Sequence, residues 1–334
     1  MVNKKNVLVI GGTAFIGIPV VKNLVENGHN VTLLNRGNRE KNIPQGVNHL
    51  KADRNEIDKV KEEIKKINPD VVIDMACIFE KQAKLLVDTV KDITSKIVMV
   101  SSCDVYEVYG RLIGTEPGDL IPTPVKETDS VRKKLYPYRN PENPSRMDDY
   151  DKITVEKTVR DSGLNWVVLR LPMVYGPNDY QYRFWKYLKR MEDKRPFILL
   201  SHYESEFKGC RGYVEDIGYG IYLSAVSDEA NNQTFNIGEE NTLTEKNWVR
   251  KIAKYAGWNG EIITLPPKDD EKPMQNLDTD TSKIRKLIGY SEVIPENIAY
   301  HKTIEWEKNN PPAQFAEPFN YEEEDKIYSE LSVS

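Results

Sequence analysis

The chain opens with a short apolar run that ends in glycines, Val7-Leu-Val-Ile-Gly-Gly-Thr-Ala-Phe-Ile-Gly17. Apolar residues then recur at helical spacing as far as Val25, so the stretch predicts a strand, a tight turn and a helix. Glycine lets the backbone approach a pyrophosphate closely, and the free N–H groups at the helix start hold the anion. An ordinary glycine-rich turn is the alternative. The context favours a dinucleotide site, with contacts from Gly11, Thr13, Ala14, Phe15, Ile16 and Gly17.

Ala14 departs from the usual glycine spacing of such turns, because it stands where a G-x-x-G-x-x-G pattern has its middle glycine. A methyl group is small, so we expect a cofactor to fit, but more tightly than over glycine.

Strand and helix signals alternate along the first half of the chain. Helices are expected at 56–67, 81–90 and 148–160, and the next strands at 31–34, 47–50, 71–74, 97–101 and 166–170. Apolar strands that alternate with amphipathic helices predict an α/β fold, a Rossmann-type doubly wound parallel sheet with helices on both faces.

The second half is mixed and predicts a smaller C-terminal α/β domain that binds the substrate. We expect a cofactor-binding domain over 1–177 and a mainly substrate-binding domain over 178–310, with a strand near 234–238 returning to the large sheet. Residues 311–334 form an acidic tail, and its charge run Glu322–Asp325 is typical of a solvated segment.

The end of the second strand bears on the choice of cofactor. It reads Leu34-Asn-Arg-Gly37 and lacks the carboxylate that usually binds the ribose 2′-hydroxyl of NAD. Arg36, with Arg39 nearby, can pair with a 2′-phosphate instead, and Asn35 is a further candidate contact. The sequence therefore predicts NADP in preference to NAD. In the alternative, both arginines point into solvent.

Composition excludes several classes of function. The 334 residues carry 47 Lys and Arg against 52 Asp and Glu, a formal net charge of −5, which argues against a bulk nucleic-acid surface. Apolar runs are too short to cross a membrane or to form a signal peptide. The three cysteines and four histidines are scattered, so no metal site is expected. We expect a cytoplasmic globular protein.

Further motifs follow in order: Leu50–Arg54, Val71–Cys77, Val100–Tyr106, Leu169–Pro177, Arg211–Ile217 and Phe235–Gly238. With the glycine turn, they resemble the extended short-chain dehydrogenase/reductase superfamily, the NAD(P)-dependent epimerase/dehydratase group. The likeness covers roughly residues 5–308. The glycine turn and the Asn-Arg-Gly after the second strand look most like an atypical subgroup that includes the chloroplast stem-loop-binding proteins.

The resemblance implies roles for particular residues. Asp53 would meet the adenine, and Ala76 and Pro172 would lie beside the cofactor. Ser102 would hydrogen-bond the reacting oxygen, while Asp104 and Arg211 would contact the substrate, most often a nucleotide sugar in this family. Relatives often form homodimers through a four-helix bundle, here the helices at 81–90 and 148–160.

The family's Tyr-x-x-x-Lys motif is absent as written from the relevant stretch, 147–157. Counting back from Arg170 puts Lys152, which would hold the nicotinamide ribose, in the lysine position, and Asp148 in the tyrosine position. Tyr150 is two residues before Lys152 and would face away from it on a regular helix. Three interpretations stay open. Tyr150 reaches the site if the helix starts late or is locally irregular, Asp148 transfers the proton, or the role is lost or supplied elsewhere, for instance by Tyr136 or Tyr138.

These features favour an NADP-dependent oxidoreductase or epimerase that transfers a hydride at a hydroxyl or carbonyl of a sugar or nucleotide-sugar-like substrate. A proline-rich loop, 118–144, is expected over the site. The aromatic stretch 178–185 can stack on a ligand or belong to the core. A non-catalytic NADP-binding regulator or scaffold is the main alternative, and RNA binding is a weaker one.

Overall fold

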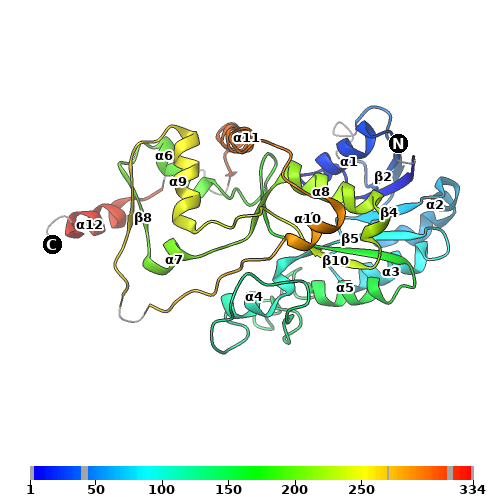
Figure 1. The fold of residues 1–334 in the computed structure, drawn as a ribbon, viewed down its shortest axis with the longest axis horizontal. Coiled ribbons are helices and arrows are strands. Elements are labelled where there is room, and N and C mark those ends of the chain that lie inside the picture. The colour runs from blue at the N-terminus through cyan, green and yellow to red at the C-terminus, as the bar shows by residue number, and fades with distance from the viewer. Residues whose placement is uncertain (1–3, 39–43, 269–270, 314–318, 332–334) are drawn as a thin grey trace. The chain divides into compact units, whose positions relative to one another are not determined.

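The computed structural model describes residues 4–38, 44–268, 271–313 and 319–331, and its central element is a seven-stranded sheet. The strand order is β10-β6-β5-β4-β1-β2-β3, every pairing in the sheet is parallel, and helices cover both faces (Figure 1). This confirms the α/β doubly wound architecture. The strands are β1 (Asn6–Ile10), β2 (Asn30–Asn35), β3 (Asn48–Lys51), β4 (Val71–Asp74), β5 (Lys96–Ser102), β6 (Asn165–Leu171) and β10 (Gln233–Asn236).

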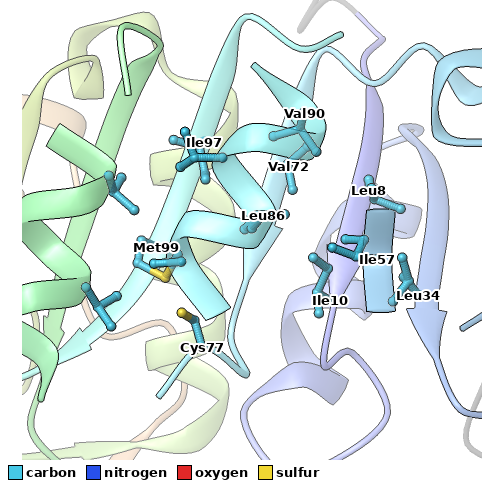
Figure 2. Packing of buried hydrophobic residues seen from close by; sticks show 14 of the residues in the cluster. Leu8, Ile10, Leu34, Ile57, Val72, Cys77, Leu86, Val90, Ile97 and Met99 are labelled. Atoms are coloured by element: carbon cyan, nitrogen blue, oxygen red, sulfur yellow. The ribbon is translucent and has the colours of Figure 1, made fainter. Parts of the chain in front are cut away.

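One face of the sheet packs on a buried apolar cluster. Successive side chains of a strand point to opposite faces, and Leu8 and Ile10 of β1 enter this cluster together with Val72 and Ile97 (Figure 2). Leu86 comes from a helix that covers them. The covering elements are η2 (Arg54–Val60), α2 (Lys61–Ile67), α3 (Glu80–Val90) and α5 (Lys152–Arg160).

The opposite face carries α1 (Gly17–Glu26) and α8 (Val214–Val226), which pack against each other. Their contact is close: a Cβ added at Gly218 would lie 2.7 Å from the Pro19 Cβ. The first strand, the glycine turn and α1 therefore sit in a rigid, tightly packed layer.

The chain divides into two compact units. Unit 1 comprises 1–174, 208–242 and 275–294, and unit 2 comprises 175–207, 243–274 and 295–334. This division differs from the expected boundary after residue 177. The segments 208–242 and 275–294 join unit 1, because β10 pairs with β6 and α8 covers the sheet. The other elements of unit 1 are η3 (Cys103–Val105), α4 (Glu107–Leu112), β9 (Arg211–Tyr213), η4 (Asp228–Ala230) and α10 (Ser282–Ile288), while β7 (Met173–Tyr175) ends at the boundary.

Unit 2 is built around an aromatic core. The Phe184 ring stacks on Tyr175 with centroids 5.3 Å apart and meets the edge of Trp248 at 5.2 Å. Within the stretch 178–185, Phe184 is thus core, whereas Tyr180 is 72% exposed. The elements of this unit are α6 (Trp185–Glu192), β8 (Phe197–Leu200), α7 (His202–Glu206), α9 (Glu245–Ala256), β11 (Glu261–Thr264), α11 (Glu296–Asn309) and α12 (Glu322–Leu331).

Residues 322–331 of the acidic C-terminal segment form α12, which makes ion pairs with other parts of unit 2, although none of its residues is buried. The solvated tail expected from the charge run is thus exposed but attached. Glu324 accepts a hydrogen bond from Arg190 Nε at 3.1 Å, and Asp325 pairs with Arg195. The Tyr328 ring stacks on Phe197 with centroids 4.1 Å apart. Ion pairs and one aromatic contact therefore hold α12 in place.

Candidate active site

The predicted cofactor residues gather at one edge of the sheet. The glycine turn, Asn35, Ala76, Ser102 and Pro172 follow the carboxyl ends of β1, β2, β4, β5 and β6, and Asp53 follows β3. The strand order reverses between β1 and β4, and such a switch point is where doubly wound sheets bind ligands. The topology thus brings together residues that are far apart in sequence.

The glycine turn is shaped for a close approach between backbone segments. Gly11 has a φ of +91°, a conformation that favours glycine. A Cβ at Gly17 would collide with the Gly11 carbonyl oxygen and lie 2.8 Å from Gly12 Cα. Ile16 precedes α1 without a side-chain cap, so the N–H groups at the helix start are not taken by a capping side chain. Gly11, Ala14, Phe15 and Ile16 are partly exposed, while Thr13 and Gly17 are buried.

Asn35 is oriented by two contacts and keeps one donor free. Its Oδ1 accepts the Gly37 N–H at 2.8 Å and lies 3.1 Å from His49 Nε2. Its Nδ2 is buried and has no hydrogen-bond partner in the described part of the chain. Arg36 is exposed, and Arg39 lies outside the described residues. The end of β2 therefore carries the donor groups of Asn35 and Arg36 and no carboxylate.

Asp53 and Ala76 are held by local hydrogen bonds. One Asp53 oxygen, Oδ1, accepts the Asn55 N–H at 2.8 Å and caps η2. The Ala76 N–H donates to Asp74 Oδ1 at 2.8 Å. Asp74 is itself buried and forms an ion pair with Arg54 at 2.5 Å, a contact between β4 and the segment after β3.

Helix α5 begins at Lys152, four residues later than expected. Asp151 is its N-cap, with φ −159° and ψ 112°, and its carboxylate accepts the Ile153 N–H at 2.8 Å. The same carboxylate pairs with Arg132 at 3.3 Å, and both side chains are fully buried. Of the acidic residues before the helix, Asp148 and Asp149 lie in a turn and Asp151 is the extended cap, with partners that a helical register would break.

Tyr150 and Lys152 both act on Asp104, and the backbone between them is extended at Asp151. Side chains two residues apart on extended backbone point to the same side. The Tyr150 hydroxyl donates to Asp104 Oδ2 at 2.6 Å. The buried Lys152 ammonium donates to the Val100 carbonyl at 3.0 Å and to the Cys77 carbonyl. The condition of the first interpretation, a late helix start, is therefore met.

Electrostatics at this point follow from burial. Burial raises the pKa of Asp104, and burial together with the Asp104 charge raises the pKa of Tyr150 well above its ordinary value. Burial also lowers the pKa of Lys152. Ser102 Oγ accepts the Asp104 N–H at 3.3 Å. Ser102, Tyr150 and the Lys152 charge all act on the Asp104 carboxyl, so the predicted hydroxyl, phenol and ammonium groups lie around one residue.

Asp148 lies apart from this group. Its carboxylate accepts the Ser145 N–H at 3.1 Å, in the turn that precedes α5. Asp148 and Lys152 do not share a helix, so the register that put Asp148 in the tyrosine position does not hold in space.

The loop 118–144 surrounds Tyr150. The Tyr138 ring lies 5.3 Å from the Tyr150 ring, and its hydroxyl is 2.6 Å from that of Tyr109. Arg132 Nε donates to the Asp104 carbonyl at 2.6 Å. Tyr136 contributes its N–H to the Asp151 carboxylate at 2.6 Å.

The two substrate-side residues differ in placement. Arg211, on β9, is buried, and its Nη1 donates to the Gly209 carbonyl at 3.2 Å. Asp104 faces Tyr150 instead of open solvent. Pro172 packs next to Gly212 and Gly238, where an added Cβ would lie 3.3 and 3.4 Å from its ring.

Sequence reasoning missed Arg132 and the double role of Asp151. Neither stands in a motif, and Arg132 lies in a stretch without hydrophobic periodicity. Within the described ranges, no group of three or more His, Cys, Asp or Glu residues is placed to hold a metal ion. None of the helices in those ranges is long and apolar enough to cross a membrane.

Three comparisons bear on this arrangement. The chain is 27% identical over 281 residues to the chloroplast stem-loop binding protein of 41 kDa b of Arabidopsis thaliana, covering 80% of this chain and 68% of that one. It is 28% identical over 173 residues to the 2′-dehydrokanamycin reductase of Streptomyces kanamyceticus, covering 51% and 43%. UDP-glucose 4-epimerase of Thermotoga maritima, solved with UDP-glucose, has a similar fold, with a TM-score of 0.68, 20% identity, and coverage of 91% and 99%.

The family assignment follows from a match that spans most of the chain. Residues 7–238 match the model of the NAD dependent epimerase/dehydratase family, from β1 through the end of β10. This segment contains the glycine turn, the Ser102–Asp104 loop and the Tyr150–Lys152 pair. The chain belongs to the NAD dependent epimerase/dehydratase family and is an NAD(P)-dependent enzyme of the extended short-chain dehydrogenase/reductase type.

Proposed function

We propose that this protein is an NADP-dependent oxidoreductase or epimerase that acts on a hydroxyl or carbonyl group of a sugar or a nucleotide-sugar-like substrate. The observation that carries the proposal is the convergence of Ser102, Tyr150 and Lys152 beside the cofactor edge of the sheet. The names of a kanamycin-class reductase and a UDP-glucose epimerase among similar proteins support a sugar-like substrate.

The chain's own residues divide the chemistry between them. A bound nicotinamide supplies or accepts the hydride. Tyr150 would exchange the proton with the substrate oxygen, and Ser102 would donate a hydrogen bond to that oxygen. The Lys152 ammonium has one N–H without a partner in the described part of the chain, which is available for a ribose hydroxyl.

The NADP preference rests on Asn35 and Arg36. The buried Nδ2 of Asn35, which has no partner within the described residues, and the exposed guanidinium of Arg36 would supply donors at the end of β2. A 2′-phosphate would satisfy both, whereas the 2′-hydroxyl of NAD would find only Asn35 within the strand end. NADPH and NADH affinities of wild type and Arg36→Ala test this. An unchanged preference in the variant would contradict it.

Turnover with a panel of UDP-sugars and simple ketosugars tests the activity. We expect Tyr150→Phe to lower the rate about 10²–10⁴-fold, the range for loss of a proton-transfer group. Asp148→Asn is the matched control, because Asp148 only closes a turn with Ser145, and it should keep the rate. No turnover with any member of the panel, with NADPH binding intact, would favour the non-catalytic alternative.

We also propose a homodimer through α3 and α5. Their outward faces line an open groove of about 460 Å³ that carries both charge signs, so two copies can present complementary charges. Lys84, Asp88 and Lys157 are among its residues. Light scattering should give twice 38.5 kDa for wild type and 38.5 kDa for the double variant Lys84→Glu/Lys157→Glu. A monomeric wild type would contradict the proposal.

A further inference from the structure

Asp104 has a buried carboxylate that is only half satisfied. The residue is 7% exposed, and its Oδ2 accepts the Tyr150 hydroxyl at 2.6 Å. Its Oδ1 is buried and has no hydrogen-bond partner within the described residues. A buried, unpaired carboxylate oxygen is costly, and a proton on the carboxyl removes most of that cost. Asp104 is therefore placed to take up a proton.

The charges around Asp104 come from several elements. Arg132, in the loop 118–144, donates to its backbone carbonyl and is paired with Asp151. Lys152, at the start of α5, is held by backbone carbonyls and acts on Asp104 through its charge. The remaining polar groups that face it are Ser102 of β5, Tyr109 of α4, and Tyr138 and Tyr150.

These neighbours fix which group can hold a charge. Burial raises the pKa of Asp104, while the hydrogen bonds from Tyr150 and Ser102 and the charges of Arg132 and Lys152 act in the opposite direction. Burial and the Asp104 carboxylate raise the pKa of Tyr150 well above its ordinary value. A Tyr150 phenolate beside this carboxylate is thus disfavoured, and Tyr150 can take a proton only while it gives up its own.

We propose that Asp104 is the terminal proton acceptor behind Tyr150. In the oxidation direction, the substrate hydroxyl proton moves to the Tyr150 oxygen as the phenol proton moves to Asp104 Oδ2. The substrate becomes an alkoxide, Tyr150 stays neutral, and the Asp104 carboxylate becomes a carboxylic acid. Reduction runs the same steps backwards. This inference rests on the proposed function, and it makes Asp104 a positioning residue that acts through Tyr150 instead of a substrate contact.

The first test needs neither substrate nor cofactor. Infrared titration of wild type against Asp104→Asn isolates the carboxylic acid band of Asp104. We expect a midpoint above the ordinary value of about 4, and a further rise in Tyr150→Phe, because that variant removes a hydrogen bond to the charged form. A carboxyl that titrates at its ordinary value, or that does not respond to Tyr150→Phe, overturns the inference.

The second test uses the pH dependence of oxidation. In wild type, kcat should fall at low pH as Asp104 becomes protonated. Asp104→Asn should lower kcat about 10²-fold or more and abolish that acid limb, and Asp104→Glu should restore part of both. An unchanged kcat with a raised KM in Asp104→Asn would make Asp104 a substrate contact and overturn the inference. Absence of turnover in wild type contradicts the proposed function, whereas the infrared result decides the Asp104–Tyr150 coupling independently.

Discussion

Tyr150 and Lys152 lie on either side of an extended Asp151, and both side chains reach the region of the Ser102–Asp104 loop. On a continuous helix the same two residues would point in nearly opposite directions. The extended backbone depends on Asp151, whose carboxylate both caps α5 and pairs with the buried Arg132. The placement of Tyr150, the proposed proton-transfer group, is therefore a consequence of where a helix begins.

Replacement of Asp151 should destabilise unit 1 strongly. Asp151→Ala leaves the fully buried Arg132 guanidinium without its carboxylate and removes the cap of α5, which predicts a loss of about 3–5 kcal/mol in the free energy of unfolding. Urea denaturation measures this. Asp149→Ala is the control, because its ion pair with Arg139 is exposed and is worth less than about 1 kcal/mol. If both variants lost the same small amount of unfolding free energy, the buried Arg132–Asp151 pair would not stabilise unit 1 as predicted.

A carboxylate at position 35 should reverse the cofactor preference. Asn35→Asp would replace the free Nδ2 donor with an acceptor for a ribose hydroxyl and would repel a 2′-phosphate. We expect NADPH binding to weaken by about tenfold or more, while NADH binding improves. Fluorescence titration with both cofactors measures this. Asn38→Asp is the control, because it adds the same charge at an exposed position nearby. If it changed the two cofactor affinities to the same extent, the added charge alone, and not its position at residue 35, would explain the effect.

The glycine turn should tolerate a change at position 14 but not at position 17. Gly17→Ala forces a methyl group against the Gly11 and Gly12 backbone, so the turn must open and lose its shape for a pyrophosphate. We expect NADPH affinity to fall about tenfold or more, with a lower melting temperature. Ala14→Gly removes a methyl group and should keep or tighten binding. Isothermal titration of both variants checks this, and equal affinities would contradict the role of the turn.

Unit 2 should lose stability at alkaline pH through Glu307. Its Oε1 accepts the Phe184 N–H at 3.1 Å, and burial raises its pKa from an ordinary 4.5 to about 8. The folded chain holds this proton more tightly than the unfolded chain does. The resulting stability is fully present below pH 4.5 and is lost as the pH rises to about 8, by up to about 1.4 kcal/mol for each pH unit.

Thermal unfolding at several pH values separates Glu307 from other groups. The amide of Glu307→Gln does not ionise, so this variant should be more stable than wild type at pH 9 and show a smaller loss between pH 5 and pH 9. Glu305→Gln alters an exposed glutamate of the same helix and should follow wild type. If the stabilities of wild type and Glu307→Gln changed with pH in parallel, the ionisation of Glu307 would not lower the stability of the folded chain, and the prediction would be wrong.

The sequence predicted the sheet well and the start of α5 poorly, for physical reasons. Apolar runs and the glycine turn are local signals, and the strand near 234–238 was expected to return to the sheet, as β10 does. The start of α5 depends on Arg132, which is 19 residues before its partner in a segment without periodicity. The segments 208–242 and 275–294 join unit 1 through contacts that no local pattern records.

The late start of α5 also changes how such chains can be recognised. A helix that carries tyrosine and lysine on one face needs them four positions apart, whereas on extended backbone two positions are enough. The stretch before Arg170 therefore lacks Tyr-x-x-x-Lys, although Tyr150 and Lys152 both act on Asp104. Where a capping aspartate separates the two residues, the sequence Tyr-Asp-Lys can produce the same spatial arrangement. Family members that lack Tyr-x-x-x-Lys should therefore be searched for Tyr-Asp-Lys before they are classed as inactive.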